Sequence, residues 1–215
     1  MTPTVYSRLA MGDSIPTLGV AMRGIEQIPW LYDAMCSLME RGGFGRWRRW
    51  LAGGARGRTL DLGCGTGRNL PLLPPGTPAI ALDPSPDAIR RAGERAPGVP
   101  RVLASAEHLP FRDATFDTVL SGLVFCSVPD APRGLAAVRR VLKSGGELRM
   151  IEHVRAARRW HARFQDAIQP AWTWIAGGCH PNRDTEAAVT RAGFVIDDRR
   201  AEGTLRRFRA FVRSG

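Results

Sequence analysis

The feature that most constrains this chain is a glycine-rich turn directly after a short apolar run. Residues 59–62 read Thr-Leu-Asp-Leu, and Gly63, Gly65 and Gly67 follow at every second position. Glycine adopts backbone conformations closed to other residues and leaves the main chain bare, so a ligand can lie directly against such a turn. The pattern predicts a strand that ends in a ligand-binding turn.

Two classes of ligand suit a turn of this kind. Dinucleotide folds use the spacing G-x-G-x-x-G, whereas the glycines here alternate with single residues. Asp61 stands two residues before the first glycine. A carboxylate there disfavours a pyrophosphate and suits the ammonium group of an amino acid. The acid therefore points to a ligand with an amino-acid portion.

The size and charge of the chain set broad limits. Its 215 residues suffice for one α/β domain with a real core. The net charge is +11, almost all from arginine, because Lys143 is the only lysine. Such a charge can mark a nucleic-acid or anionic-membrane surface, or it can reflect composition alone. The arginines are spread along the chain, which favours composition.

The cysteines show no motif along the sequence. Cys36, Cys64, Cys126 and Cys179 are far apart, so there is neither a zinc-ligand spacing nor a C-x-x-C pair. We therefore expect no metal and a reducing, cytoplasmic location. No apolar run approaches the ~18–20 residues of a membrane span, and the first residues lack the order of a secretory signal.

The periodicity of apolar residues predicts the organisation of the chain. Residues 1–27 show little pattern and are expected to be a tail or lid, and residues 28–215 a single domain. Within it, residues 28–54 read as a helical cap, 58–154 as the ligand-binding core, and 155–215 as substrate-side helices and an edge hairpin.

Strands and helices alternate regularly through this domain. Ser85 and Pro86 are expected to begin a helix, as N-cap and first residue. A long helix near residues 160–175 should keep one side apolar and kink or break near Gln169, because Pro170 follows. Further strands are expected at 79–83, 99–104, 116–121, 147–154, 194–196 and 208–212. Together these predict an α/β, Rossmann-like, seven-stranded, mostly parallel sheet with helices on both faces.

Several motifs now combine into a family resemblance. Residues 61–67, D-x-G-x-G-x-G, resemble the first motif of the class I S-adenosylmethionine (SAM) methyltransferases. Residues 106–111 resemble the AExLPF segment of the methyltransferase type 11 branch, which includes quinone-biosynthesis enzymes. Residues 116–119 resemble its FDxV strand, and residues 140–146 its RVLKPGG turn, with Ser144 in place of proline. The resemblance implies a SAM-dependent methyltransferase.

The second half resembles a narrower family, the animal thiol S-methyltransferases. The likeness lies in residues 123–128, 151–154 and 169–172, followed by Gly178-Cys179 and Arg183. The animal proteins carry an apolar N-terminal anchor, and no comparable segment occurs here, so membrane attachment stays open.

The resemblance implies which residues would contact SAM. The turn would lie along the methionine part and ribose, Asp61 would orient the amino group, and Asp83 would accept from the ribose hydroxyls. Ser105 replaces an aspartate common in relatives, so its contact with adenine is expected to be weak, and Glu107 has a structural alternative. The expected cofactor contacts are Asp61, Gly63, Cys64, Gly65, Gly67, Asp83, Pro84, Ser105, Ala106, Glu107, Gly122 and Leu123.

The sequence says less about the residues that would bind the methyl acceptor than about those that would bind the cofactor. A thiol has a pKa of about 8.5, so a histidine could remove its proton, and His153, then His180, are the candidates. Tyr32, Phe125 and Trp172 are candidate walls of an acceptor pocket, with core packing as the alternative. The expected acceptor is small or lipophilic: a thiol sulfur first, then a quinone-type carbon or a phospholipid amine.

Three rival functions remain open from the sequence. The charge suggests RNA methylation, but residues 122–125 carry no N/D-P-P-aromatic motif of base-modifying enzymes. An NAD(P)-dependent reductase and a non-catalytic SAM-binding protein are the others. For partners, we expect a small-molecule or lipid-like substrate and no nucleic acid, with peripheral contact to an anionic membrane left as an alternative.

Overall fold

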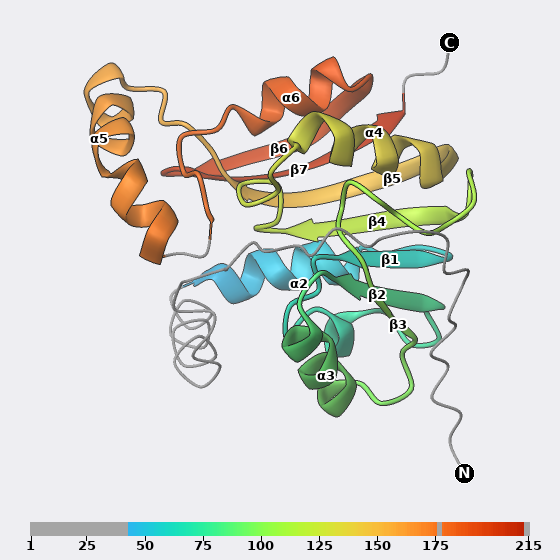
Figure 1. The fold of residues 1–215 in the computed structure, drawn as a ribbon. Coiled ribbons are helices and arrows are strands. Elements are labelled where there is room, and N and C mark those ends of the chain that lie inside the picture. The colour runs from blue at the N-terminus through green and yellow to red at the C-terminus, as the bar shows by residue number, and fades with distance from the viewer. Residues whose placement is uncertain (1–42, 176–177, 213–215) are drawn as a thin grey trace, which may run out of the picture.

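A computed structural model of the protein describes residues 43–175 and 178–212. Its seven strands form one sheet in the order β3-β2-β1-β4-β5-β7-β6 (Figure 1). All neighbours are parallel except β7, which runs antiparallel to both β5 and β6. The strands are β1 Thr59–Leu62, β2 Ala79–Asp83, β3 Arg101–Leu103, β4 Phe116–Gly122, β5 Leu142–His153, β6 Phe194–Glu202 and β7 Leu205–Val212. The predicted seven-stranded, mostly parallel sheet is confirmed.

Helices cover both faces of this sheet, as predicted. Helices α4 and α6 contact each other on one face, whereas α2 contacts β4 and β5 from the other. The helices are α2 Gly45–Gly53, η3 Leu70–Leu72 (a 3-10 turn), α3 Pro86–Arg95, α4 Ala131–Val141, α5 Arg159–Ile175 and α6 Thr185–Arg191. Of the predicted helical cap, α2 is described; the preceding part and Tyr32 lie outside the described residues.

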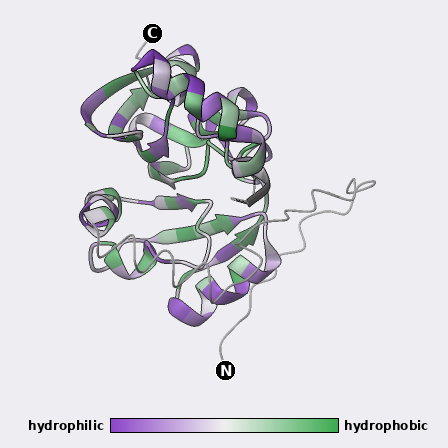
Figure 2. Ribbon diagram, turned by 90° about the vertical axis from the view of Figure 1, so that its left-hand side faces the viewer, coloured by the Kyte–Doolittle hydropathy of each residue, from purple (hydrophilic) through white to green (hydrophobic). Residues whose placement is uncertain are grey.

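The strands are apolar on both sides because both faces are covered. Leu62, Val119 and Met150 belong to the core under α4 and α6. Leu120 and Ile151 pack on the opposite side, in the cluster that includes residues of α2. In Figure 2 the central strands are largely green and the helices carry both colours, as expected of amphipathic helices.

Side-chain caps fix where the helices begin. The Ser85 Oγ accepts a hydrogen bond from the Ala88 N–H at 3.3 Å, with Pro86 as the first helical residue. Asp130 caps α4 in the same way, accepting from the Arg133 N–H at 3.0 Å. The predicted start of the helix at Ser85 and Pro86 is confirmed.

Helix α5 shows two features that the sequence did not define. Helix α5 continues through Pro170 without a break, so the loss of one backbone donor does not end it. Its apolar side is also not buried: the exposed fractions of Trp160 and Phe164 are 65% and 56%. The reason is that α5 lies beyond the carboxyl ends of the parallel strands, not against a face of the sheet (Figure 1).

Candidate active site

The three glycines of the turn after β1 have different roles. Gly63, Gly65 and Gly67 have φ angles of 61°, 53° and 78°, which L-residues rarely adopt. A Cβ on Gly63 would lie 2.5 Å from a methyl of Val124, and one on Gly67 would lie 2.9 Å from the Cα of Ala92. A Cβ on Gly65 would meet nothing within 4 Å. Two glycines therefore permit close packing, and Gly65 faces open space.

The carboxylate of Asp83 ties this turn to the start of α3. Its Oδ2 accepts a hydrogen bond from the Gly65 N–H at 2.9 Å, and its Oδ1 from the Ser85 N–H at 2.9 Å. Burial raises the pKa of Asp83, while these two bonds lower it. Each oxygen keeps lone pairs that can accept from a hydroxyl. The predicted ribose-binding acid thus lies directly at the turn, with Pro84 beside it.

Asp61 is a buried acid with one unused oxygen. Its side chain is fully buried, and its Oδ1 accepts from the Asn69 amide at 2.7 Å. Its Oδ2 has no hydrogen-bond partner in the structure. Burial raises the pKa of Asp61 to about 7, opposed by the Asn69 bond and the charge of Arg48. A buried carboxylate oxygen without a partner is the atom that a ligand's ammonium group would satisfy.

A small cavity of about 50 Å³ joins the turn to the end of β4. It is lined by residues 63–66, by Gly122 and Leu123, and by Phe44 and Arg48 from the start of α2. Leu123 has a φ of 62°, unusual for a branched residue, and its N–H donates to the Ile151 carbonyl at 2.7 Å. The structure therefore brings together the turn and two further predicted cofactor contacts, Gly122 and Leu123.

Three of the predicted cofactor contacts, Ser105, Ala106 and Glu107, are engaged with other protein groups or buried. The Ser105 Oγ lies 3.2 Å from the His108 Nδ1, and the Glu107 carboxylate accepts from the Asp130 N–H at 3.3 Å. Ala106 is buried in the core. None of the three lines the small cavity. The hydrogen bond of Glu107 to the Asp130 N–H agrees with a structural role, the alternative raised for Glu107 from the sequence.

A buried acid that the sequence did not single out holds the loop after β4. The Glu152 Oε1 accepts from the N–H groups of Val124 and Phe125 at 2.9 and 2.8 Å, and its Oε2 from the Cys126 N–H at 3.2 Å. Burial raises the pKa of Glu152 to about 7, although these hydrogen bonds oppose the shift. The loop beside Leu123 is thus fixed by one carboxylate.

Both candidate histidines lie near this loop. The His180 N–H donates to the Cys126 carbonyl at 2.8 Å, and its Nδ1 lies 2.7 Å from the Gly178 carbonyl. A carbonyl only accepts, so this contact assigns the proton to Nδ1 and leaves Nε2 as an acceptor. The ligand atoms of Cys126, His153 and Cys179 all lie within 4.8 Å of one another.

Two predicted aromatic walls of the acceptor pocket differ in burial. Phe125 is fully buried, and a Cβ on Gly134 would lie 3.0 Å from its ring, so the structure places Phe125 in the core. Trp172 lies on α5 with 40% of its surface exposed. Core packing, the alternative raised from the sequence, thus applies to Phe125.

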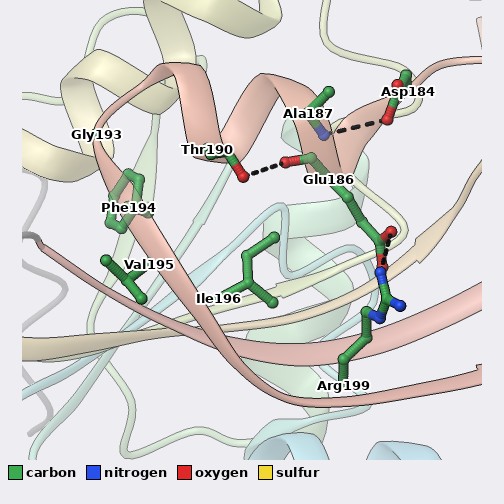
Figure 3. Close-up of a pocket in the computed structure, with 9 residues that line it drawn as sticks. All are labelled: Asp184, Glu186, Ala187, Thr190, Gly193, Phe194, Val195, Ile196 and Arg199. Carbon is green, nitrogen blue, oxygen red and sulfur yellow. Dashed lines mark hydrogen bonds and ion pairs between the residues drawn. The ribbon is translucent and has the colours of Figure 1, made fainter.

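A larger hollow of about 680 Å³ lies elsewhere, between α6 and β6 (Figure 3). Thr190 and Glu186 line it from α6 and Val195 and Arg199 from β6, and Arg199 pairs with the Glu186 carboxylate at 3.3 Å. It contains none of the predicted cofactor contacts. Volume alone therefore does not identify the site.

Comparison with known proteins agrees with this geometry. Residues 60–150 match the family model of the methyltransferase domain. This stretch of the chain is similar to methyltransferase domains. The match runs from β1 to β5 and so includes the turn, Asp61, Asp83 and Leu123.

Relatives of this methyltransferase domain act on different acceptors. Human thiol S-methyltransferase TMT1A is 36% identical over an alignment of 143 residues, and the match covers 63% of this chain and 59% of that protein. The ubiquinone/menaquinone biosynthesis C-methyltransferase UbiE of Desulfotalea psychrophila is 36% identical over an alignment of 124 residues, and the match covers 54% of this chain and 50% of that protein. The chain thus spans 59% of the length of the human thiol S-methyltransferase it matches.

Solved structures show the same fold. A SAM-dependent methyltransferase from Thermotoga maritima superposes with a TM-score of 0.68 and 23% identity, over 88% of this chain and 98% of that one. The YcgJ protein from Bacillus superposes with a TM-score of 0.66 and 16% identity, over 81% of this chain and all of that one. Among the described residues, no helix is long and apolar enough to cross a membrane.

Proposed function

We propose that this protein transfers the methyl group of SAM to the thiol sulfur of a small or lipophilic acceptor. The observation that carries the cofactor side is the buried Oδ2 of Asp61, which has no hydrogen-bond partner and stands two residues before the glycine turn. The acceptor class is supported by the likeness to thiol S-methyltransferases. Methylation of a quinone carbon is the alternative, supported by the likeness to UbiE.

The residues present fit the cofactor. Asp61 would take its ammonium group, the main chain at Gly65 its methionine portion, and Asp83 its ribose hydroxyls. Ligand sites usually measure about 300–1,000 Å³, more than the small cavity here, so Phe44 and Arg48 would move aside as the cofactor enters. The bound cofactor supplies a methyl group on a positively charged sulfur.

The chain's own part is to position the acceptor and to move one proton. Most of the acceleration can come from holding the two reactants in line. The thiol must lose its proton, and Nε2 of His180 is an acceptor whose orientation is fixed through the Gly178 carbonyl. His153 is the alternative base, at the end of β5.

The test is turnover of alkyl thiols with SAM, followed by release of S-adenosylhomocysteine across pH. His180→Asn should lower kcat/KM at pH 7 at least tenfold and recover near pH 9, where the thiol ionises unaided. His161→Asn, on α5 and outside the site, is the matched control. If no thiol turns over while a quinol does, the thiol assignment is wrong. If the His180 variant keeps the wild-type profile, His180 is not the base.

A further inference from the structure

We propose that Cys126, His153 and Cys179 form a binding site for a zinc-type cation. They come from three separate segments: the loop after β4, the last residue of β5 and the loop after α5. Each offers one ligand atom, and these atoms all lie within 4.8 Å of one another. The sequence shows no zinc spacing because neighbouring members are 27 and 26 positions apart.

The donor set selects the kind of metal. Two sulfurs and an imidazole nitrogen suit zinc, whereas magnesium and calcium prefer oxygen. Zinc–sulfur bonds of about 2.3 Å in a tetrahedron place two sulfurs about 3.8 Å apart. The cluster would therefore close by about 1 Å at most to hold zinc. Two thiolates would also balance the charge of the ion.

The fold holds the three ligands in place without a metal. The backbone N–H of Cys126 donates to the buried Glu152 carboxylate at 3.2 Å, and the Cys179 carbonyl accepts from the Thr173 hydroxyl at 3.1 Å. His153 belongs to β5, in the middle of the sheet. The exposed fractions of Cys126 and Cys179 are only 2% and 7%. Such supporting contacts are typical of metal sites with preset geometry.

Three protein ligands leave a fourth position open on zinc. The cluster begins three residues beyond Leu123, which lines the small cavity beside the glycine turn. We assign the fourth position to the sulfur of the acceptor thiol, a step that rests on the proposed function. A thiol that coordinates zinc releases its proton, which Nε2 of His180 would accept as in the proposed function, and remains as the thiolate.

The site itself is tested by zinc titration of the full chain, reduced and stripped of metal with a chelator. We expect one zinc ion bound by this cluster, and affinity at least tenfold lower in Cys126→Ser, Cys179→Ser and His153→Gln. Cys64→Ser and His161→Gln change a cysteine and a histidine outside the cluster and should keep the wild-type affinity. Equal zinc affinity in wild type and all three cluster variants would overturn the site, as would no zinc binding by the fully reduced chain.

A second readout does not depend on folding of the variants. Cobalt(II) bound to the wild-type chain should show sulfur-to-cobalt charge-transfer absorption, because two ligands are thiolates. Its absence would overturn the site. Mass spectrometry of the unreduced chain tests the alternative, a disulfide between Cys126 and Cys179. If this disulfide persists after a thiol reductant is added, no thiolates remain for a metal, and the zinc site would also be overturned.

The role of the fourth position is tested with 2-mercaptoethanol as the probe. Added to the cobalt protein, it should intensify the charge-transfer band, and an unchanged band would refute coordination of the acceptor. Thiol methylation at an unchanged rate by zinc-free protein would refute the metal's role and leave the proposed function standing. A zinc-loaded protein that methylates no thiol would refute the proposed function and leave the site standing.

Discussion

At the scale of single residues, the proposed cofactor site depends on Asp61, a buried acid with only one of its two carboxylate oxygens hydrogen-bonded. Asn69 satisfies one oxygen of Asp61, and the other has no partner in the structure. Burial raises the pKa of Asp61 to about 7, so a cationic ligand group must draw it into the ionised form. Ligand binding and ionisation of Asp61 should therefore be coupled.

We predict that SAM affinity rises roughly fivefold between pH 6 and pH 7.5, since Asp61 ionises in this range. An α-amino group, with a pKa of about 8, stays largely protonated there. In Asp61→Asn the affinity should be lower at pH 7.5 and nearly independent of pH. Calorimetric titration at the two pH values measures this. A variant that keeps the wild-type pH dependence would show that Asp61 does not receive the ammonium group.

Gly65 offers a second prediction at this scale. Gly65→Ala should fold with a cost of about 1–2 kcal/mol from its φ of 53°, because its Cβ meets no protein atom. It should nevertheless weaken SAM binding at least tenfold, since the methyl group enters the ligand's space. Gly76→Ala is the matched control, with a φ of 77° and equally open surroundings away from the site. Equal SAM affinity in both variants would refute the placement of the ligand.

At the scale of elements, the loop after β4 is held by a side chain from the neighbouring strand. Glu152 on β5 accepts three backbone N–H groups of that loop, which lies between the small cavity and the cysteine cluster. Burial raises its pKa to about 7 from an ordinary value near 4.5. The folded chain thus binds this proton more tightly than the unfolded chain does.

The sign of the resulting pH effect is fixed by linkage. Between pH 4.5 and 7 the folded state keeps the Glu152 proton and the unfolded state has lost it, so rising pH removes stability, by up to about 1.4 kcal/mol per pH unit. Glu152→Gln lacks this proton. Its free energy of unfolding should therefore fall less steeply than that of the wild type between pH 5 and 7. Urea unfolding at both values measures the slopes, and equal slopes would contradict the shifted pKa.

The exposed side of α5 leads to a prediction about partners. Trp160 and Phe164 are largely exposed, and Arg158, Arg159 and Arg163 lie beside them on the surface. Aromatic and basic side chains together favour an anionic membrane surface. We predict that replacing Trp160 and Phe164 with alanine lowers binding to phosphatidylserine vesicles several-fold. Leu103→Ala, which removes an exposed apolar residue on β3, should not. Unchanged vesicle binding by the double variant would refute this contact.

At the scale of the whole molecule, the alternation of strands and helices could be predicted because it depends on local sequence signals. Apolar runs, proline and serine caps and glycine turns act within a few residues, so β2 is found as expected, at Ala79–Asp83. Strand β6 extends to Glu202, well past the predicted 196, because it pairs with β7 over this length. Its residues 197–202 are exposed at the sheet edge, and all except Ala201 are charged. Such a strand carries no hydrophobic pattern to reveal it.

Contacts between distant segments could not be predicted, because sequence patterns act only within a few residues. Asn69 reaches Asp61 from beyond the glycine turn, and nothing in its surroundings marks it as a partner. Cys126 and Cys179 are 53 positions apart in the sequence and meet only through the fold. Motifs could place the cofactor residues, which follow one another closely, but not a cluster assembled from three segments.

The structure of the whole molecule also bears on the origin of the high positive net charge. Several arginines pair with acids on the surface, such as Arg155 with Asp166 at 2.6 Å and Arg209 with Asp197 at 2.7 Å. Arg149 is instead buried against the ring of Trp50, 4.4 Å from its centre. These arginines serve different parts of the fold, which supports composition, not a single partner surface, as the source of the net charge.

The most direct test of the central proposal is identification of the methylated product. The full chain is incubated with methyl-labelled SAM and an equimolar mixture of an alkyl thiol, a demethylated quinol and a phospholipid amine. We predict label in the thioether, with S-adenosylhomocysteine formed in equal amount, and a marked loss of both in Asp61→Asn at pH 7.5. Label found only in the quinol or the phospholipid would contradict a thiol acceptor, and no label in any product would contradict methyl transfer to these acceptors.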